Sequence, residues 1–226
     1  MAQNTSRRGA FAVLGGLVAV ATGWQLYLGR PEKLSFTSIE GAPGWQIAEL
    51  GDVSASPSDA VLLGLDDEAI DPLPASELRQ TVYPMDEKLA VFSDAFCPHC
   101  RRLVPALASA YPGQVHYHAL PFFGAFSERV ARAAVAAEMQ GDKGAMHILF
   151  HATPIRPTPS FFKRTAESQG LNGDQLLVDM ESAAVTDRLL QTRRAAERLG
   201  IWGTPAIAIG QKVVMGSVAP DEVANL

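Results

Sequence analysis

The pattern of hydrophobic and polar positions becomes regular from about residue 87 onward. Leu89–Phe92 is an uninterrupted apolar run of strand length, and residues 115–120 alternate well enough to predict a second strand. Residues 98–111 between them fit a helix, although Pro105 interrupts it. Near the end of the chain, residues 205–209 and 212–215 predict a hairpin that turns at Gly210-Gln211.

Residues 126–199 predict a block of helices inserted between these strands. The clearest helix runs over 127–140, with Ser127 as the expected N-cap and Gly141 just past the end. Its small apolar residues share one face. The other predicted helices cover 143–151, 159–169, 174–181 and 186–199, and a short terminal helix follows over 220–226.

The first 30 residues have the pattern of a membrane-directed segment. Arg7 and Arg8 precede residues 9–28, which carry no charge. About 20 such residues just cross a ~30 Å hydrocarbon layer, so the segment is either a membrane anchor or a cleaved signal peptide with a site near residues 19–21. Ser6-Arg7-Arg8 also resembles the start of a twin-arginine signal. A buried core helix is the third interpretation.

Residues 31–86 show no sustained helical or strand period. Several proline and glycine residues interrupt the segment, which we expect to be an irregular extension with one or two short strands. The acidic run at 66–68 fits a solvated surface better than a metal site.

The composition narrows the function. The chain has 226 residues, of which 47% are hydrophobic, enough for one sizeable domain and an extension. Its formal net charge of −5 argues against a polyanionic partner such as nucleic acid. It contains 2 cysteines, Cys97 and Cys100, which cannot build a disulfide scaffold and must form one functional pair.

A strand, a C-x-x-C and a helix in this order predict a redox dithiol. Cys97 is expected at the helix N-cap, where free N–H groups and the helix dipole favour a thiolate. Pro98 suits the first helical position, and His99 adds a donor or a cation beside the sulfur. We therefore expect Cys97 to be the nucleophile and Cys100, one turn further along, to be the buried resolving thiol.

Two motifs far apart in the chain carry a family resemblance. Residues 96–100 (Phe-Cys-Pro-His-Cys) resemble the active site of the DsbA-like branch of the thioredoxin superfamily. Residues 200–206 resemble the loop in which that family places a cis-proline, here Pro205, against the active-site disulfide. The resemblance implies a thioredoxin-like α/β fold over 87–226 with an inserted helical subdomain. It also implies that the backbone of Thr204 pairs with an extended substrate peptide, and that Trp202 borders it.

The same resemblance implies a protein disulfide oxidoreductase of the bacterial periplasm or the outer face of the inner membrane. Its substrates would be exported proteins that contain cysteine, and a membrane redox partner would recycle it. No cofactor is expected besides the Cys97–Cys100 disulfide. No metal is expected either.

Two positions depart from the family pattern. Relatives commonly carry a buried acid six residues before the first cysteine, where this chain has Val91. Asp94 is the nearest carboxylate, and we expect it to cap or turn the strand end. Threonine at position 204 is seen more in isomerase-like and reductase-like relatives, so the direction of electron flow stays open.

Other interpretations also stay open. The protein could be a disulfide reductase or isomerase of the same fold, or a copper- or zinc-binding module that uses the C-x-x-C. His116 with His118, and His147 with His151, have ligand-like spacing. Four aromatic residues could form either an apolar rim for unfolded substrates or part of the core: Phe96, Phe122, Phe123 and Trp202.

Overall fold

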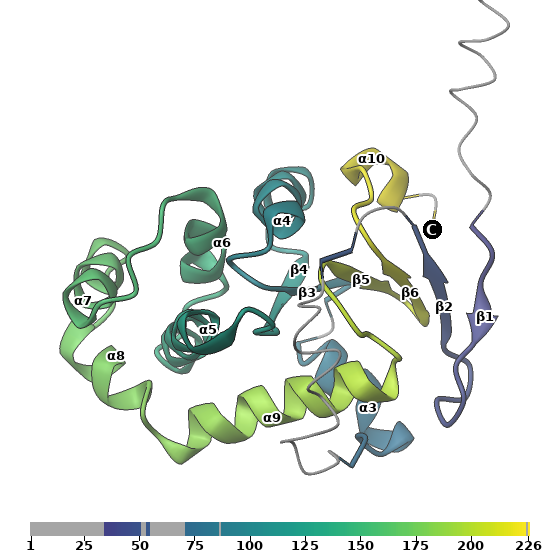
Figure 1. Ribbon diagram of the computed structural model, residues 1–226, viewed down its shortest axis with the longest axis horizontal. Helices are drawn as coiled ribbons and strands as arrows, with labels where there is room; N and C mark the ends of the chain where they lie inside the picture. The colour runs from purple at the N-terminus through teal and green to yellow at the C-terminus, as the bar shows by residue number, and fades with distance from the viewer. Residues whose placement is uncertain (1–33, 51–52, 55–70, 86, 225) are drawn as a thin grey trace, which may run out of the picture. The chain divides into compact units, whose positions relative to one another are not determined.

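The computed structural model describes residues 34–50, 53–54, 71–85, 87–224 and 226 (Figure 1). Residues 35–226 form one compact unit. The predicted membrane-directed segment, residues 1–30, lies outside the described residues. Within the part of the chain that the structure describes, every helix is too short or too polar to cross a bilayer.

The unit is built on a single six-stranded sheet in the order β1-β2-β6-β5-β3-β4. Strand β3 lies between β4 and β5, is buried at every position, and pairs in parallel with β4 and antiparallel with β5. Phe92 near the end of β3 lies opposite Ala206 at the start of β5. This register places the C-x-x-C beside Pro205. The strands are β1 (Thr37–Ser38), β2 (Gln46–Glu49), β3 (Leu89–Ser93), β4 (Val115–Ala119), β5 (Ala206–Ile209) and β6 (Lys212–Met215).

Helices cover both faces of the sheet. Helices α3 (Ala75–Val82) and α9 (Ala183–Arg198) pack on the face that carries Ala90 and Phe92. Figure 1 shows α4 (Pro98–Ala110) and α10 (Pro220–Val223) on the opposite side. The alternation of side chains along β3 explains why an uninterrupted apolar run is needed for a strand that is covered on both faces.

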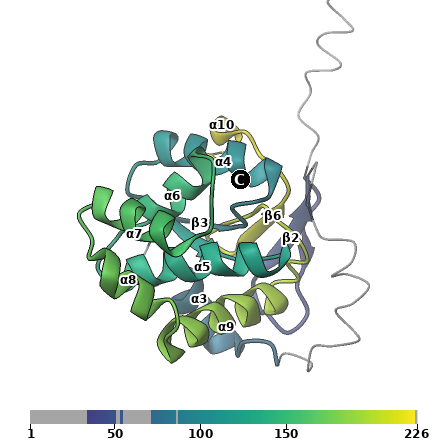
Figure 2. The ribbon, with the colours of Figure 1, turned by 60° about the vertical axis from the view of Figure 1, so that its left-hand side comes forward.

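A second hydrophobic core lies in the helical insertion. It joins α5 (Gly124–Met139), α6 (Ala145–Ala152), α7 (Pro159–Ser168) and α8 (Gly173–Asp179). Figures 1 and 2 agree that these helices lie at the end of the sheet away from β1 and β2. Alanines of α5 make up much of this core, since small side chains let the neighbouring helices approach closely.

The structure corrects one prediction about the insertion. The helix expected to start at Ser127 begins at Gly124, and Phe123 occupies the N-cap. Ser127 lies inside the helix, where its hydroxyl donates a hydrogen bond to Asp94. A serine that serves a tertiary contact has the same sequence pattern as a capping serine.

The segment predicted to be irregular is more ordered than expected. The short strands anticipated there are β1 and β2, and β2 pairs in parallel with β6 and so extends the main sheet. Helix α3 was not anticipated. Its Leu78 and Val82 are fully buried, so the described part of this segment contributes to the core rather than only covering it.

Candidate active site

The two cysteines lie where β3 passes into α4. Cys97 is the N-cap of α4, and its sulfur accepts a hydrogen bond from the Cys100 backbone N–H at 3.4 Å. Pro98 occupies the first turn, where its missing N–H costs no helical hydrogen bond. The N-cap position of Cys97 and the place of Pro98 are as predicted, whereas both cysteines, and not Cys100 alone, are fully buried.

The surroundings make the two thiols very different acids. The pKa of Cys97 is lowered to about 5, chiefly by a hydrogen bond from the Cys100 thiol and, to a smaller extent, by the Cys100 backbone N–H and the hydroxyls of Ser54 and Thr204. Burial opposes this shift. The pKa of Cys100 is raised well above its usual value, mainly by burial and by its place next to Cys97. At neutral pH the pair therefore holds one thiolate and one thiol.

The loop before β5 closes the site from the other side. The Thr204–Pro205 peptide bond is cis. Thr204 is fully buried, and its carbonyl oxygen lies 3.4 Å from the Cys97 sulfur, which can donate to it only as the protonated thiol. The structure thus brings the two sequence motifs together across 107 residues of chain.

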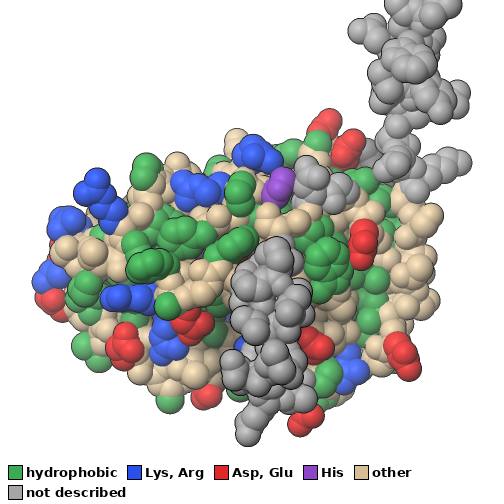
Figure 3. Space-filling view, viewed as in Figure 1, with side chains coloured by type: hydrophobic (Ala, Val, Ile, Leu, Met, Phe, Trp, Pro, Cys, Tyr) green, Lys and Arg blue, Asp and Glu red, His purple; other side chains and the backbone are tan. Residues whose placement is uncertain are grey.

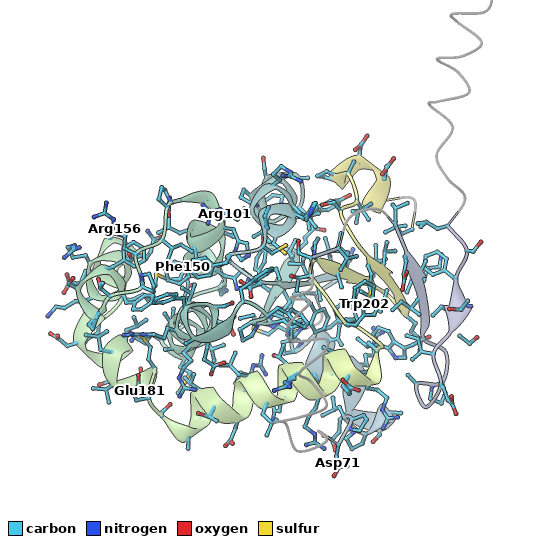
Figure 4. The ribbon with its side chains drawn as sticks, in the orientation of Figure 1. Asp71, Arg101, Phe150, Arg156, Glu181 and Trp202 are labelled. Atoms are coloured by element: carbon cyan, nitrogen blue, oxygen red, sulfur yellow. The ribbon has the colours of Figure 1, made fainter. Side chains whose placement is uncertain are left out.

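The other predicted site residues lie around this pair. Trp202 is 51% exposed, and its indole N–H donates to Glu49 at 3.2 Å. Its place on the loop between α9 and β5 is labelled in Figure 4. His99 is partly exposed, and its Nδ1 lies 3.1 Å from the Arg102 guanidinium. Because a guanidinium can only donate, Nδ1 is the acceptor in this contact.

Asp94 organises the turn between β3 and α4. One carboxylate oxygen accepts from the backbone N–H of Phe96, and the other accepts from Phe122, Phe123 and the hydroxyl of Ser127. Its carbonyl accepts from Cys97 N–H at 3.0 Å. Burial raises the pKa of the Asp94 carboxyl, and these hydrogen bonds oppose the rise. Asp94 therefore turns the strand end, as expected, while Val91 is a buried apolar residue.

Arg101 ties the first turn of α4 to the helical insertion. Its guanidinium donates to the carbonyls of Ala95, Phe150 and Thr153 at 2.8 to 3.1 Å. Figure 4 shows it between α4 and α6. A planar guanidinium suits this role, because it can donate to several carbonyls at once. The sequence contains no signal for this contact.

The aromatic residues near the site divide between rim and core. Phe96 and Phe122 are partly buried and pack against the two hydrophobic cores, whereas Trp202 is half-exposed. Phe126, which the sequence did not single out, is 64% exposed at the start of α5. On the face shown in Figure 3, hydrophobic side chains gather over the α5 and α6 side and over the β2 and β6 side.

Of the paired histidines, His118, His147 and His151 are buried, and His116 is partly buried. His118 donates to the Val82 carbonyl, and His147 contacts the Ser93 hydroxyl at 2.8 Å. Burial holds the pKa values of both well below the usual range, so both are neutral at pH 7. The described residues contain no group of three or more side chains that could hold a metal ion.

Comparison with known families decides the class of this site. Residues 88–226 match the model of the DSBA-like thioredoxin domain. The chain belongs to this family. The match covers both C-x-x-C and the Thr204–Pro205 loop, and it confirms the thioredoxin-like fold and the family inferred from the two motifs. Among curated proteins, none matches.

Solved structures agree with this DSBA-like domain. A thioredoxin-like oxidoreductase from Silicibacter pomeroyi DSS-3 is 30% identical, covers 65% of this chain and 94% of its own, and has a TM-score of 0.55. The catalytic domain of Proteus mirabilis ScsC is 25% identical over 67% of this chain and 92% of its own, with a TM-score of 0.53. The thiol-disulfide exchange protein α-DsbA2 from Wolbachia pipientis, at 16% identity over 76% and 97% with a TM-score of 0.58, shares the fold.

Besides Arg101, sequence reasoning missed the contact of Ser127 with this DSBA-like site and did not single out Ser54. Ser127 supports Asp94, and Ser54 contacts Thr204 through two backbone hydrogen bonds. Neither has a sequence signature, because a serine at a helix start or in an irregular segment has many ordinary roles.

Proposed function

We propose that this protein exchanges disulfides with exported proteins that contain cysteine, with Cys97 as the attacking and leaving sulfur. The observation that carries the proposal is the asymmetry of the pair: a Cys97 thiolate at the start of α4 beside a Cys100 thiol of raised pKa. A thiolate is the reactive form, and a thiolate of low pKa is also a good leaving group.

In the oxidised protein, a substrate thiolate attacks the Cys97 sulfur and the Cys97–Cys100 bond breaks. The electron pair leaves with Cys100, which takes up a proton because its pKa is raised. A second substrate thiolate then attacks the substrate sulfur of the mixed disulfide and expels Cys97 as a thiolate. Two electrons have moved from the substrate to the protein, and an electron acceptor at the membrane must remove them.

Two further parts of the proposal concern substrate and place. Trp202 and Phe126 offer exposed aromatic surface to unfolded chains. The arginine pair and the uncharged segment before residue 30 support export to the periplasm or to the outer face of the inner membrane.

The function is tested with the two cysteine variants. Cys97→Ser should abolish both insulin reduction and oxidative refolding activity, whereas Cys100→Ser should accumulate substrate proteins in mixed disulfides with Cys97. Wild-type turnover in both variants would overturn the proposal. Identification of the trapped adducts would name the substrates.

Threonine at position 204 favours a second candidate, a reductase or isomerase with the same site. The two directions differ in the redox state that the cell maintains. A Cys97–Cys100 pair found oxidised in cells supports the oxidase, and a pair found reduced supports the reductase or isomerase.

A further inference from the structure

A residue of the N-terminal extension sits on the backbone of Thr204. The Ser54 N–H donates to the Thr204 carbonyl at 2.8 Å, and the Thr204 N–H donates to the Ser54 carbonyl at 3.0 Å. Together they form an isolated antiparallel bridge outside the main sheet. Both backbone groups of Thr204 are thereby used within the chain.

This bridge adjoins the reactive sulfur. The Thr204 carbonyl oxygen that accepts from Ser54 also lies 3.4 Å from the Cys97 sulfur. The Ser54 hydroxyl is one of the groups that act on Cys97. Ser54 therefore lies beside the nucleophile, although 43 positions separate the two residues in the chain.

An incoming substrate needs the same groups. An extended peptide that adds to a chain as a strand binds through backbone N–H and C=O groups. At Thr204 these are the groups that Ser54 occupies. A peptide strand and Ser54 cannot both form an antiparallel pair with Thr204.

We propose that Ser54 occupies the position of a substrate strand, so that an extended peptide reacts with Cys97 only after it displaces Val53 and Ser54 from Thr204. The inference rests on the proposed function and adds a competition between Ser54 and the substrate peptide for the backbone of Thr204. The displaced residue is a serine, which offers no sulfur of its own and so cannot react with Cys97. Ser54 thus makes the backbone hydrogen bonds expected of a substrate strand but has no thiol that could exchange with Cys97.

The bridge should slow exchange with peptide disulfides more than exchange with small disulfides. Two backbone hydrogen bonds correspond to roughly a 5- to 100-fold preference for the bridged state. A peptide that needs Thr204 binds more weakly by that factor. A small disulfide without peptide groups does not need Thr204. The signature of the bridge is therefore the ratio of the two exchange rates.

The ratio is measured with two probes that share a leaving group. One is an extended peptide whose cysteine carries a mercaptoethanol mixed disulfide, and the other is 2-hydroxyethyl disulfide. Each is reduced by the dithiol protein, which becomes oxidised. Ser54→Pro removes the N–H donor of the bridge and thus one of its two hydrogen bonds, so we expect the peptide-to-small-disulfide rate ratio to rise roughly 3- to 10-fold.

Two variants control for side effects of this substitution. Ser54→Ala removes the hydroxyl and keeps the backbone bridge, so its ratio should equal that of the wild type. Glu40→Pro places a proline elsewhere in the same extension, in the Ile39–Ala42 turn before Gly41, whose φ of 73° fits a type II turn. This variant should also keep the wild-type ratio.

The outcomes separate this inference from the proposed function. If the wild type exchanges both disulfides and Ser54→Pro leaves the ratio within about twofold, the bridge does not compete with substrate and the inference is wrong, while the function stands. If neither protein exchanges either disulfide, both are wrong.

A second measurement applies even if Ser54→Pro does not fold. In the mixed disulfide between Cys100→Ser and the peptide, hydrogen exchange at the Ser54 amide should become at least about tenfold faster, while the Thr204 amide stays protected by the peptide. Equal Ser54 exchange with and without the peptide would overturn the inference.

Discussion

Replacing Cys100 tests the physical origin of the Cys97 thiolate. The strongest interaction that lowers the Cys97 pKa is the hydrogen bond from the Cys100 thiol, and the N–H of Cys100 contributes less. Cys100→Ala removes the side-chain donor and keeps the backbone donor. Cys100→Ser keeps a hydroxyl that can donate in the place of the thiol. The two variants therefore differ mainly in one hydrogen bond to the sulfur.

The size of the effect follows from the pKa of about 5. At pH 6, about 90% of such a Cys97 is thiolate, against about 0.1% for an unperturbed thiol with a pKa of 9.0. We expect Cys100→Ala to raise the pKa of Cys97 by about 1 to 2 units, which leaves about 10 to 50% thiolate at pH 6. Cys100→Ser should stay closer to the wild type.

The assay is the ultraviolet absorbance of the thiolate in the reduced protein, followed against pH, with the rate of alkylation by iodoacetamide as a second readout. Cys97→Ser supplies the baseline without the nucleophile. A wild-type midpoint near that of free cysteine would refute the reasoning. Equal midpoints in the alanine and serine variants would show that the Cys100 side chain does not act as a donor.

Three further predictions concern pH, the strand turn and the rim. Because folding lowers the pKa of Cys97, the thiolate stabilises the reduced protein fully above the unfolded pKa, near 9, and this stabilisation is lost as the pH falls through about 5. The Tm of the reduced protein relative to that of the oxidised protein should therefore drop between pH 9 and pH 5. A constant Tm difference would contradict this prediction. Asp94→Ala leaves three backbone N–H groups and the Ser127 hydroxyl without their acceptor. Urea unfolding should therefore show a free energy of unfolding lower by at least about 3 kcal/mol, against about 1 to 2 kcal/mol for Ser127→Ala. Equal losses in the two variants would argue against Asp94 as the centre of the turn. Trp202→Ala removes a half-exposed side chain, so the free energy of unfolding should change by less than about 1 kcal/mol. The rate of disulfide exchange with extended peptides should fall severalfold. An unchanged rate would exclude Trp202 from the substrate surface.

The place of Cys97 within its own helix follows from local sequence. An N-cap sulfur, a proline at the first helical position and a second cysteine one turn later depend only on residues 97–100 and on helix geometry. The apolar run that forms β3 is similarly local, because a strand covered on both faces must be apolar at every position. For these reasons the dithiol and the N-cap position of Cys97 could be predicted without the structure.

The contacts that complete the site could not be predicted, because they join distant parts of the chain through groups that leave no pattern in the sequence. Every residue has a backbone N–H or C=O of the kind that links Ser54 to Thr204, so the sequence of residues 53–54 does not predict the bridge. A serine near a helix start fits a cap as well as a partner for Asp94. The parallel pairing of β2 with β6 likewise depends on packing between segments more than 160 residues apart. The sequence was enough to predict which sulfur lies at the helix N-cap, and the tertiary structure decided which backbone groups lie beside it, since local geometry sets a helix cap whereas long-range pairing is settled only when the whole core packs.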